Sequence, residues 1–240
     1  MKTILHKANT RGHANFGWLN SFHTFSFGQY RNAERNHFGA LRVLNDDTVE
    51  KGMGFGKHPH ENMEIVSIPL YGDLHHSDST GRSEIIREHD VQIMSAGTGI
   101  AHSEMNANKD KAVKFLQIWV FPKNYNIEPR YEQKTFNPAN RQNQVLTVVA
   151  PDDEKAVWIN QDAWFSLANL SNGFETSYNW HSKNSGVYAF LIKGNATING
   201  QELEERDGLG IWDTADPLQI KAGSDAELLL IEVPMELEAA

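Results

Sequence analysis

Short apolar runs separated by turn residues make up most of the chain. They recur about every ten residues, with Gly, Asp, Asn or Pro between them. Examples are MEIVSIPLYG (63–72), VKFLQIWVFP (113–122), QVLTVVAP (144–151), VYAFLIKGNATING (187–200) and AELLLIEVP (226–234). No long stretch follows the roughly 3.6-residue period of a helix. This pattern predicts an all-β sandwich or barrel with few, short helices.

The two halves of the chain resemble each other. The segment IPLYGDLHHSDSTGRSEIIREHDVQIMSAG matches FLIKGNATINGQELEERDGLGIWDTAD. Each has an apolar strand, a Gly (Gly72, Gly194), a hairpin, an acidic turn (Asp90, Asp207) and a second apolar strand. Residues 121–144 are polar, contain three prolines and are typical of a connector. We therefore expect two copies of one β-barrel module, at 1–125 and 126–240.

Composition excludes several classes of function. The 240 residues carry a formal net charge of −9 and no cluster of Lys and Arg, which argues against nucleic-acid binding. The absence of cysteine excludes disulfides, thiolate metal sites and Cys nucleophiles. No segment has the length of a signal peptide core or a membrane span. We expect a cytoplasmic protein that binds neither nucleic acid nor membrane.

Histidine is the conspicuous residue type, with eleven copies. Because alternate residues of a strand share a face, His58 and His60 point to the same side, as does Glu64 if the strand stays regular. His102 and Glu104 share a face in the same way. Two adjacent strands could then gather three imidazoles and a carboxylate, a set that suits Fe(II), Mn, Ni, Cu or Zn.

The His58-Pro59-His60 pair also has a simpler interpretation. A His-x-His pair alone is common in loops without any metal, and the proline disturbs a regular strand ladder. We therefore expect these residues at a strand edge or in a loop. The second pair about forty residues further on, in a β-rich chain, favours the metal site.

Two stretches resemble the motifs of the cupin family of small β-barrels. Residues 52–72 have Gly, five residues, His-x-His, three residues, Glu and a closing Gly, which comes one residue later than usual. Residues 99–106 read Gly-x-x-His-x-x-x-Asn, with Ser95 where the second motif often has Pro. The segments HTFSFGQY (23–30), FGKHPHENMEIVSIPLYGDLHHSDSTG (55–81) and QIMSAGTGIAHSEMN (92–106) resemble more narrowly the pirin family of two-barrel cupins.

The resemblance to pirins implies a set of metal ligands, namely His58, His60, His102 and Glu104. It implies that Glu64 is not a primary ligand. The matching stretch of the C-terminal half has only His181, so we expect that barrel to hold no metal.

The resemblance also implies an activity. Bacterial pirins include quercetin 2,3-dioxygenases, which cleave the central ring of a flavonol with O2 and release carbon monoxide. Glu104 is then both a ligand and the base for the flavonol hydroxyl. Fe(II) is the expected metal, with Cu, Ni, Co, Mn or Zn as alternatives, and we expect a monomer. Two other functions stay open: a cupin enzyme acting on another phenolic substrate, and a non-catalytic, metal-dependent regulatory or binding protein like the eukaryotic pirins.

Other residues receive ordinary interpretations. His75 and His76 lie in a predicted hairpin, where we expect solvated side chains. His23 is expected to make a core or inter-strand hydrogen bond. Phe55 and Met63, which are apolar and close to the ligands in sequence, are candidates for the lining of a substrate pocket.

Overall fold

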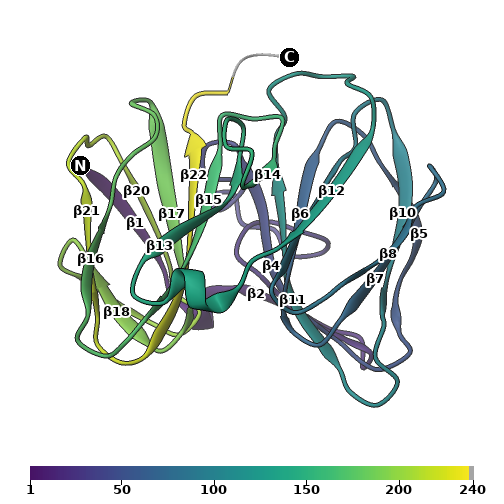
Figure 1. Cartoon of the computed structure of the whole chain (residues 1–240), viewed down its shortest axis with the longest axis horizontal. Helices are drawn as coiled ribbons and strands as arrows, with labels where there is room; N and C mark the ends of the chain where they lie inside the picture. The colour runs from purple at the N-terminus through teal and green to yellow at the C-terminus, as the bar shows by residue number, and fades with distance from the viewer. Residues whose placement is uncertain (238–240) are drawn as a thin grey trace.

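Two β-barrels lie side by side in the molecule (Figure 1), which confirms the prediction of an all-β protein built from two cupin barrels. The structure is a computed structural model and describes residues 1–237. Within this range, helical structure is limited to two short 3-10 segments, η1 (Ala8–Thr10) and η2 (Pro138–Arg141). None of the helices in the described part of the chain could cross a membrane.

The N-terminal barrel combines a seven-stranded sheet with a four-stranded sheet, and all neighbouring strands are antiparallel. In spatial order, the larger sheet has β12 (Arg130–Thr135), β9 (Asp90–Ser95), β6 (Glu64–Tyr71), β11 (Val113–Val120), β4 (Leu41–Val49), β3 (Leu19–His23) and β2 (Gly12–Asn15). The smaller sheet has β5 (Gly54–His60), β10 (Ile100–Asn106), β7 (Leu74–Asp78) and β8 (Ser83–Ile86).

The C-terminal barrel repeats this arrangement of seven and four strands. Its larger sheet has β1 (Lys2–His6), β20 (Gly208–Trp212), β17 (Ser185–Lys193), β22 (Ala226–Pro234), β15 (Trp164–Leu170), β13 (Val145–Ala150) and β14 (Val157–Trp158). Its smaller sheet has β16 (Glu175–Tyr178), β21 (Leu218–Ala222), β18 (Asn195–Ile198) and β19 (Gln201–Glu204). The matched order explains the internal sequence similarity. Gly72 and Gly194 both turn the chain after their strand with positive φ angles of 73° and 81°, which favour glycine.

The barrels exchange edge strands. β1, from the start of the chain, pairs with β20 of the C-terminal barrel, whereas β12, which follows residue 125, pairs with β9 of the N-terminal barrel. Part of the predicted connector at 121–144 is therefore a strand. The division into 1–125 and 126–240 stays a prediction. β1 lies before this boundary but belongs to the C-terminal barrel, and β12 lies after it but belongs to the N-terminal barrel.

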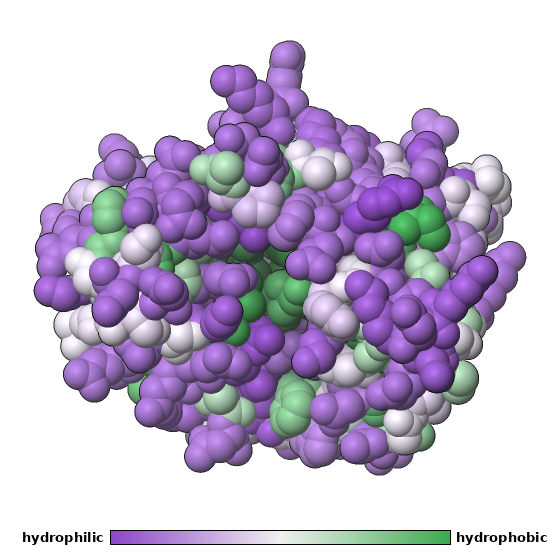
Figure 2. Space-filling view, turned by 60° about the horizontal axis from the view of Figure 1, so that its bottom comes forward, coloured by the Kyte–Doolittle hydropathy of each residue, from purple (hydrophilic) through white to green (hydrophobic). Residues whose placement is uncertain are grey.

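The largest apolar cluster lies between the barrels, where the two seven-stranded sheets face each other. It joins Val66, Ile68 and Ile118 of the N-terminal barrel to Phe165 and Leu229 of the C-terminal barrel. Figure 2 shows the complementary pattern at the surface, which is mostly hydrophilic, with hydrophobic residues gathered in a hollow between the two lobes. Burial of this shared face holds the barrels together.

The lumen of the N-terminal barrel has an apolar, a polar and a second apolar layer. Along β11, Phe115, Gln117 and Trp119 share the inner face. Phe115 belongs to one apolar cluster and Trp119 packs against another, so Gln117 lies between them. The inward residues of β10 at this level are His102 and Glu104, both buried. The polar layer therefore holds the residues singled out by the sequence motifs.

Candidate metal centre

Two neighbouring strands bring three histidines together. β5 is the edge strand of the small sheet, as Pro59 requires, and it pairs with β10 so that His58 lies opposite His102. His60 shares the face of His58. The ring centroids are 4.6 Å apart for His58 and His102, 4.8 Å for His58 and His60, and 4.9 Å for His60 and His102. One nitrogen of each ring lies within 4.8 Å of the others.

The hydrogen bonds of these rings leave suitable nitrogens free for a metal. His58 Nδ1 lies 2.8 Å from the Gly56 carbonyl oxygen, so this nitrogen carries the proton and Nε2 keeps its lone pair. His102 Nε2 is buried and has no hydrogen-bond partner, while its Nδ1 contacts another histidine. A buried nitrogen without a partner is costly, and a metal ion would satisfy it. The residues therefore fit a divalent transition metal.

Burial keeps two of the rings neutral. It lowers the pKa of His102 to about 2, helped by the neighbouring His58, His60 and His76. It also lowers the pKa of His60 to about 4, helped by His58. Only a neutral imidazole can donate a lone pair to a metal, so both rings are ready to bind at neutral pH.

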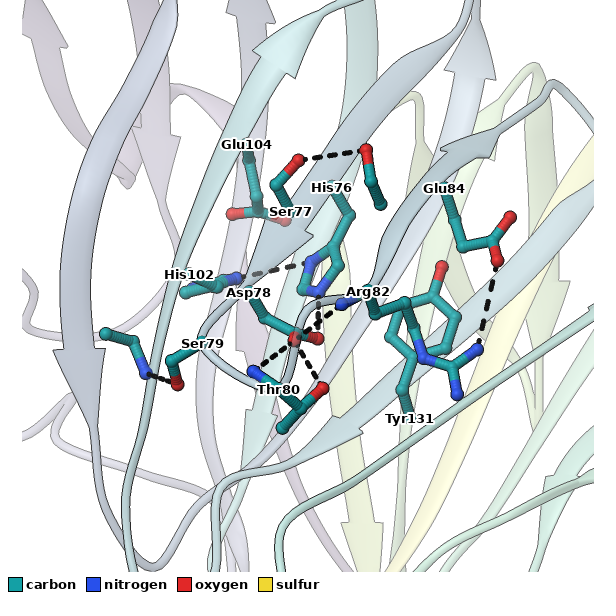
Figure 3. A network of polar contacts seen from close by, with 12 residues as sticks. His76, Ser77, Asp78, Ser79, Thr80, Arg82, Glu84, His102, Glu104 and Tyr131 are labelled. Carbon is teal, nitrogen blue, oxygen red and sulfur yellow. Dashed lines mark hydrogen bonds and ion pairs between the residues drawn. The ribbon is translucent and has the colours of Figure 1, made fainter.

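A second histidine supports His102 from behind (Figure 3). His102 Nδ1 lies 3.4 Å from His76 Nδ1, and His76 Nε2 lies 2.9 Å from Asp78 Oδ2. If His102 binds metal through Nε2, its Nδ1–H donates to His76, and the Nε2–H of His76 donates to the Asp78 carboxylate. This chain fixes the orientation and tautomer of both rings.

The expectation of a solvated His76 is therefore wrong, since its side chain is buried. The ring also packs against Tyr131 of β12, with centroids 4.9 Å apart, and Arg82 covers the far side of Tyr131 (Figure 3). The spacing of His76 and Asp78, two residues apart on one strand face, was the available signal. His75 points to the opposite face and is partly exposed.

Glu104 lies in the same polar layer. Its Oε1 accepts a hydrogen bond of 3.1 Å from Ser67, and its Oε2 accepts one from Gln117. The carboxylate is not among the atoms that gather within 4.8 Å, which are all from histidines. Each of its oxygens keeps a second lone pair. Burial raises the pKa of Glu104, against the opposing effect of nearby His76.

Glu64 points elsewhere, because the strand does not stay regular. β5 ends at His60 and β6 begins at Glu64, with a turn at Asn62, whose φ is 48°. Glu64 Oε2 accepts hydrogen bonds from Ser95 Oγ at 2.8 Å and from the Asn160 backbone N–H at 3.1 Å. Asn160 follows β14, so this carboxyl group lies where the barrels meet.

A cavity of about 740 Å³ opens beside the histidines. Its lining mixes polar residues with a group of aromatic ones, and it includes Phe16, Trp18, Phe27, Tyr30, Phe55 and Trp119, together with His58, His60 and Glu104. This volume is in the range of sites for small organic molecules, roughly 300–1,000 Å³. Phe55 is a lining residue as expected, but Met63 packs against the apolar cluster around Ile65 instead.

The C-terminal barrel offers no comparable group among the described residues. Its His181 contacts Glu232, with Nδ1 3.0 Å from Oε2. The buried Glu232 also accepts hydrogen bonds from Tyr178, Ser185 and the backbone N–H of Ser182. His181 is thus part of a hydrogen-bonded network around the buried carboxylate of Glu232.

Fold and site together define a two-barrel cupin with a three-histidine centre in its N-terminal barrel. Comparison with known proteins agrees. The Pirin family matches residues 5–120, and a family described as the quercetinase C-terminal cupin domain matches residues 147–233. The chain belongs to the pirin family.

Relatives extend over nearly the whole chain. A quercetin 2,3-dioxygenase of Escherichia coli K12 is 44% identical over 230 residues, covering 96% of this chain and 98% of the relative. A pirin-like protein of Caulobacter vibrioides is 38% identical over 223 residues, covering 92% and 95%. The crystal structure of the bacterial pirin YhhW from E. coli in complex with nickel(II) matches with a TM-score of 0.92 and 41% identity, covering 98% of this chain and 100% of that one.

Proposed function

We propose that this protein is a metal-dependent dioxygenase that cleaves the central ring of a flavonol with O2. The observation that carries the proposal is the position of three histidines, one with an unpartnered buried Nε2, beside a large aromatic cavity. The 44% identical relative named quercetin 2,3-dioxygenase supports the same activity.

The reaction breaks two carbon–carbon bonds of the central ring. The ring carbon that bears the 3-hydroxyl leaves as carbon monoxide, and both atoms of O2 enter the products. The other product is a phenolic ester, a depside, which keeps all the remaining carbons. The flavonol is oxidised and O2 is reduced, so no further oxidant or reductant is needed.

His58, His60, His102 and Glu104 are the residues that we propose hold the metal. Held there, a divalent transition metal supplies the Lewis-acid and redox chemistry by which an electron-rich phenol reacts with O2. Fe(II) is the metal that we propose, although the same donors accept Cu, Ni, Co, Mn or Zn. Metal analysis of the purified protein tests this choice.

Glu104 is proposed to take the proton of the flavonol 3-hydroxyl. Its burial raises its pKa, which makes the carboxylate a stronger base. Ser67 and Gln117 keep the carboxylate oriented by their hydrogen bonds. The aromatic rings of Trp119 and Phe55 would pack against the flat flavonol and keep water from the reacting carbons.

The test is aerobic incubation of the iron-loaded protein with quercetin. We expect loss of the flavonol absorbance and carbon monoxide in the headspace, and neither with His58→Ala. Intact turnover by Glu104→Gln would remove the role of Glu104 as the base. No turnover with iron, copper, nickel, cobalt or manganese would overturn the dioxygenase proposal and would favour a metal-dependent binding role or another phenolic substrate.

We further propose that the protein acts as a cytoplasmic monomer without nucleic-acid partners. The formal net charge of −9 supports the last point. Size-exclusion chromatography with light scattering tests the monomer.

A further inference from the structure

The aromatic cavity has a polar wall on β3 and β4 that no step above uses. It consists of Ser21, His23, Asn45 and Asp47, which we call the polar pole. His23 lies opposite Asn45, and Ser21 lies opposite Asp47, so all four side chains face the lumen. All four line the cavity, and each is at most 5% exposed. Buried polar groups on a cavity wall need partners.

Aromatic contacts connect the polar pole to the metal centre. The His23 ring lies 5.2 Å from the Phe27 ring, and Phe27 lies 5.4 Å from Trp119. The Trp119 ring in turn lies 5.0 Å from His60. A molecule that reached both the histidines and the polar pole would thus lie against a continuous aromatic surface.

The hydrogen bonds inside the polar pole determine what His23 offers to a ligand. The Ser21 hydroxyl donates its proton to Asp47 Oδ1. Its oxygen can then only accept from His23 Nε2, which lies 2.8 Å away and must carry the ring proton. His23 Nδ1 therefore keeps a lone pair. Burial, with His13 and Arg11 nearby, lowers the pKa of His23, which keeps the ring neutral.

Two buried acceptors of the polar pole have no partner. They are His23 Nδ1 and Asn45 Oδ1. Leaving such an atom without a partner destabilises the protein, and a ligand hydroxyl that donated to it would remove this cost. Burial raises the pKa of Asp47 to about 7, so above neutral pH its carboxylate disfavours an anionic ligand at this place. The chemistry that fits is therefore a neutral O–H donor on an aromatic ring.

We propose that the polar pole binds the hydroxyl groups of a substrate ring that lies away from the metal. The proposal rests on the proposed function, because it takes the cavity to be the flavonol site. It specifies the substrate class as a polyhydroxylated phenol, which meets the metal centre with one hydroxyl and the polar pole with others. Flavonols without ring hydroxyls would bind less tightly.

The test compares two ligands that differ only in those hydroxyls. Quercetin and 3-hydroxyflavone share the 3-hydroxyl and the 4-carbonyl, but 3-hydroxyflavone lacks every other hydroxyl. Dissociation constants are measured with the iron-loaded protein without oxygen, so that turnover does not interfere. We expect the wild type to bind quercetin at least about tenfold more tightly, as hydrogen bonds to buried acceptors predict.

Two variants and a matched control locate the effect. Asn45→Leu and His23→Phe should each reduce the preference for quercetin about tenfold. The control is Gln92→Leu, because Gln92 is equally buried and also has an unpartnered atom but does not line the cavity. It should keep the full preference. Asn45 Oδ1 makes no hydrogen bond in the protein without ligand, so the substitution Asn45→Leu should not lower the melting temperature.

The outcomes separate this proposal from the dioxygenase proposal. An unchanged preference in Asn45→Leu and His23→Phe would overturn the polar pole, even if carbon monoxide is still formed. A preference that both variants lose would support the polar pole, even if no carbon monoxide is formed. If the wild type bound neither compound, or both equally, the polar pole would be overturned.

Discussion

The lumens of the two barrels differ at matching positions of their strands. In the N-terminal barrel, Gln117 lies opposite Ser67, which lies opposite Gln92. In the C-terminal barrel, the corresponding row is Leu230, Ala189 and Leu209. The second row belongs to an apolar cluster that fills its barrel. One copy of the fold thus uses its interior for stability. The other gives part of that stability up for polar side chains, of which Ser67 and Gln117 orient Glu104.

The buried carboxyl groups show the same contrast. Burial raises the pKa of Glu64 to about 7, against hydrogen bonds from Asn160 and Ser95. Burial also acts on Glu232, but hydrogen bonds from His181 and its neighbours prevail and lower the pKa of that group. The C-terminal barrel therefore holds a stable anion, whereas the N-terminal barrel holds a carboxyl group that favours its proton.

Removing one histidine from each barrel should lower the metal content in one case and leave it unchanged in the other. His58→Ala should lower the metal retained per chain well below one ion, because it removes one of the three imidazoles and leaves a smaller proposed donor set of His60, His102 and Glu104. Elemental analysis after dialysis measures this. His181→Ala is the control and should leave the metal content unchanged. Loss of metal in the control would contradict the assignment of the site to the N-terminal barrel.

Glu64→Gln should change how stability depends on pH. The folded pKa of about 7 lies above the unfolded value of 4.5, so the folded wild type binds more protons between these values and loses stability as pH rises through this window. Gln does not titrate, so above pH 7 the variant should be more stable by an amount on the order of 3 kcal/mol, with little difference near pH 4. Urea unfolding in the presence of a chelator measures this.

Glu232→Gln should show the opposite sign. The lowered pKa of Glu232 means that its anion contributes stability above the unfolded value of 4.5, and this contribution is lost as pH falls through that region. The variant should therefore be less stable than wild type at neutral pH. Equal changes in the free energy of unfolding for Glu64→Gln and Glu232→Gln at pH 8 would contradict the contrast between the two carboxyl groups.

His76→Phe should weaken the metal site without removing a ligand. The support of a ligating histidine by a second group is worth about 10–100-fold in metal affinity. Competition with a chelator of known affinity measures the change. His75→Phe, next to it on the opposite strand face, should leave the affinity unchanged. Equal affinities of His76→Phe and wild type would show that His102 needs no support.

Gln92→Leu should make the lumen of the N-terminal barrel more like the apolar lumen of the C-terminal barrel. Gln92 Nε2 is buried without a partner, so the substitution should raise the free energy of unfolding by about 1 kcal/mol. Denaturant titration measures the gain, and metal content should not change. The reverse change, Leu209→Gln, should lower stability by about 3 kcal/mol. A stabilising effect of Leu209→Gln would contradict the comparison.

Much of the fold could be predicted from local patterns. Short apolar runs indicated strands, and the repeated Gly72 and Gly194 indicated two equivalent modules, because both features depend only on neighbours along the chain. The exchange of β1 and β12 could not be predicted. Pairing between strands so far apart in sequence depends on which sheet edge is free, and residue patterns do not record that.

The site divides in the same way. The alternation of side chains along a strand predicted that His58 and His60 share one face, and it predicted the same for His102 and Glu104. The burial of His76, the turn that directs Glu64 to Asn160, and the polar pole had weaker signals, since each depends on segments between 26 and 96 residues apart. In sequence, Ser21 and His23 alternate with other residues as any solvent-facing pair would.

By itself, the sequence determined the strands, the two modules and the donor atoms available to a metal, because period and residue type are local properties. Only the tertiary structure decided which polar residues face a closed lumen and which face water. That decision follows from barrel closure, which turns one face of every strand inward and removes its polar groups from solvent.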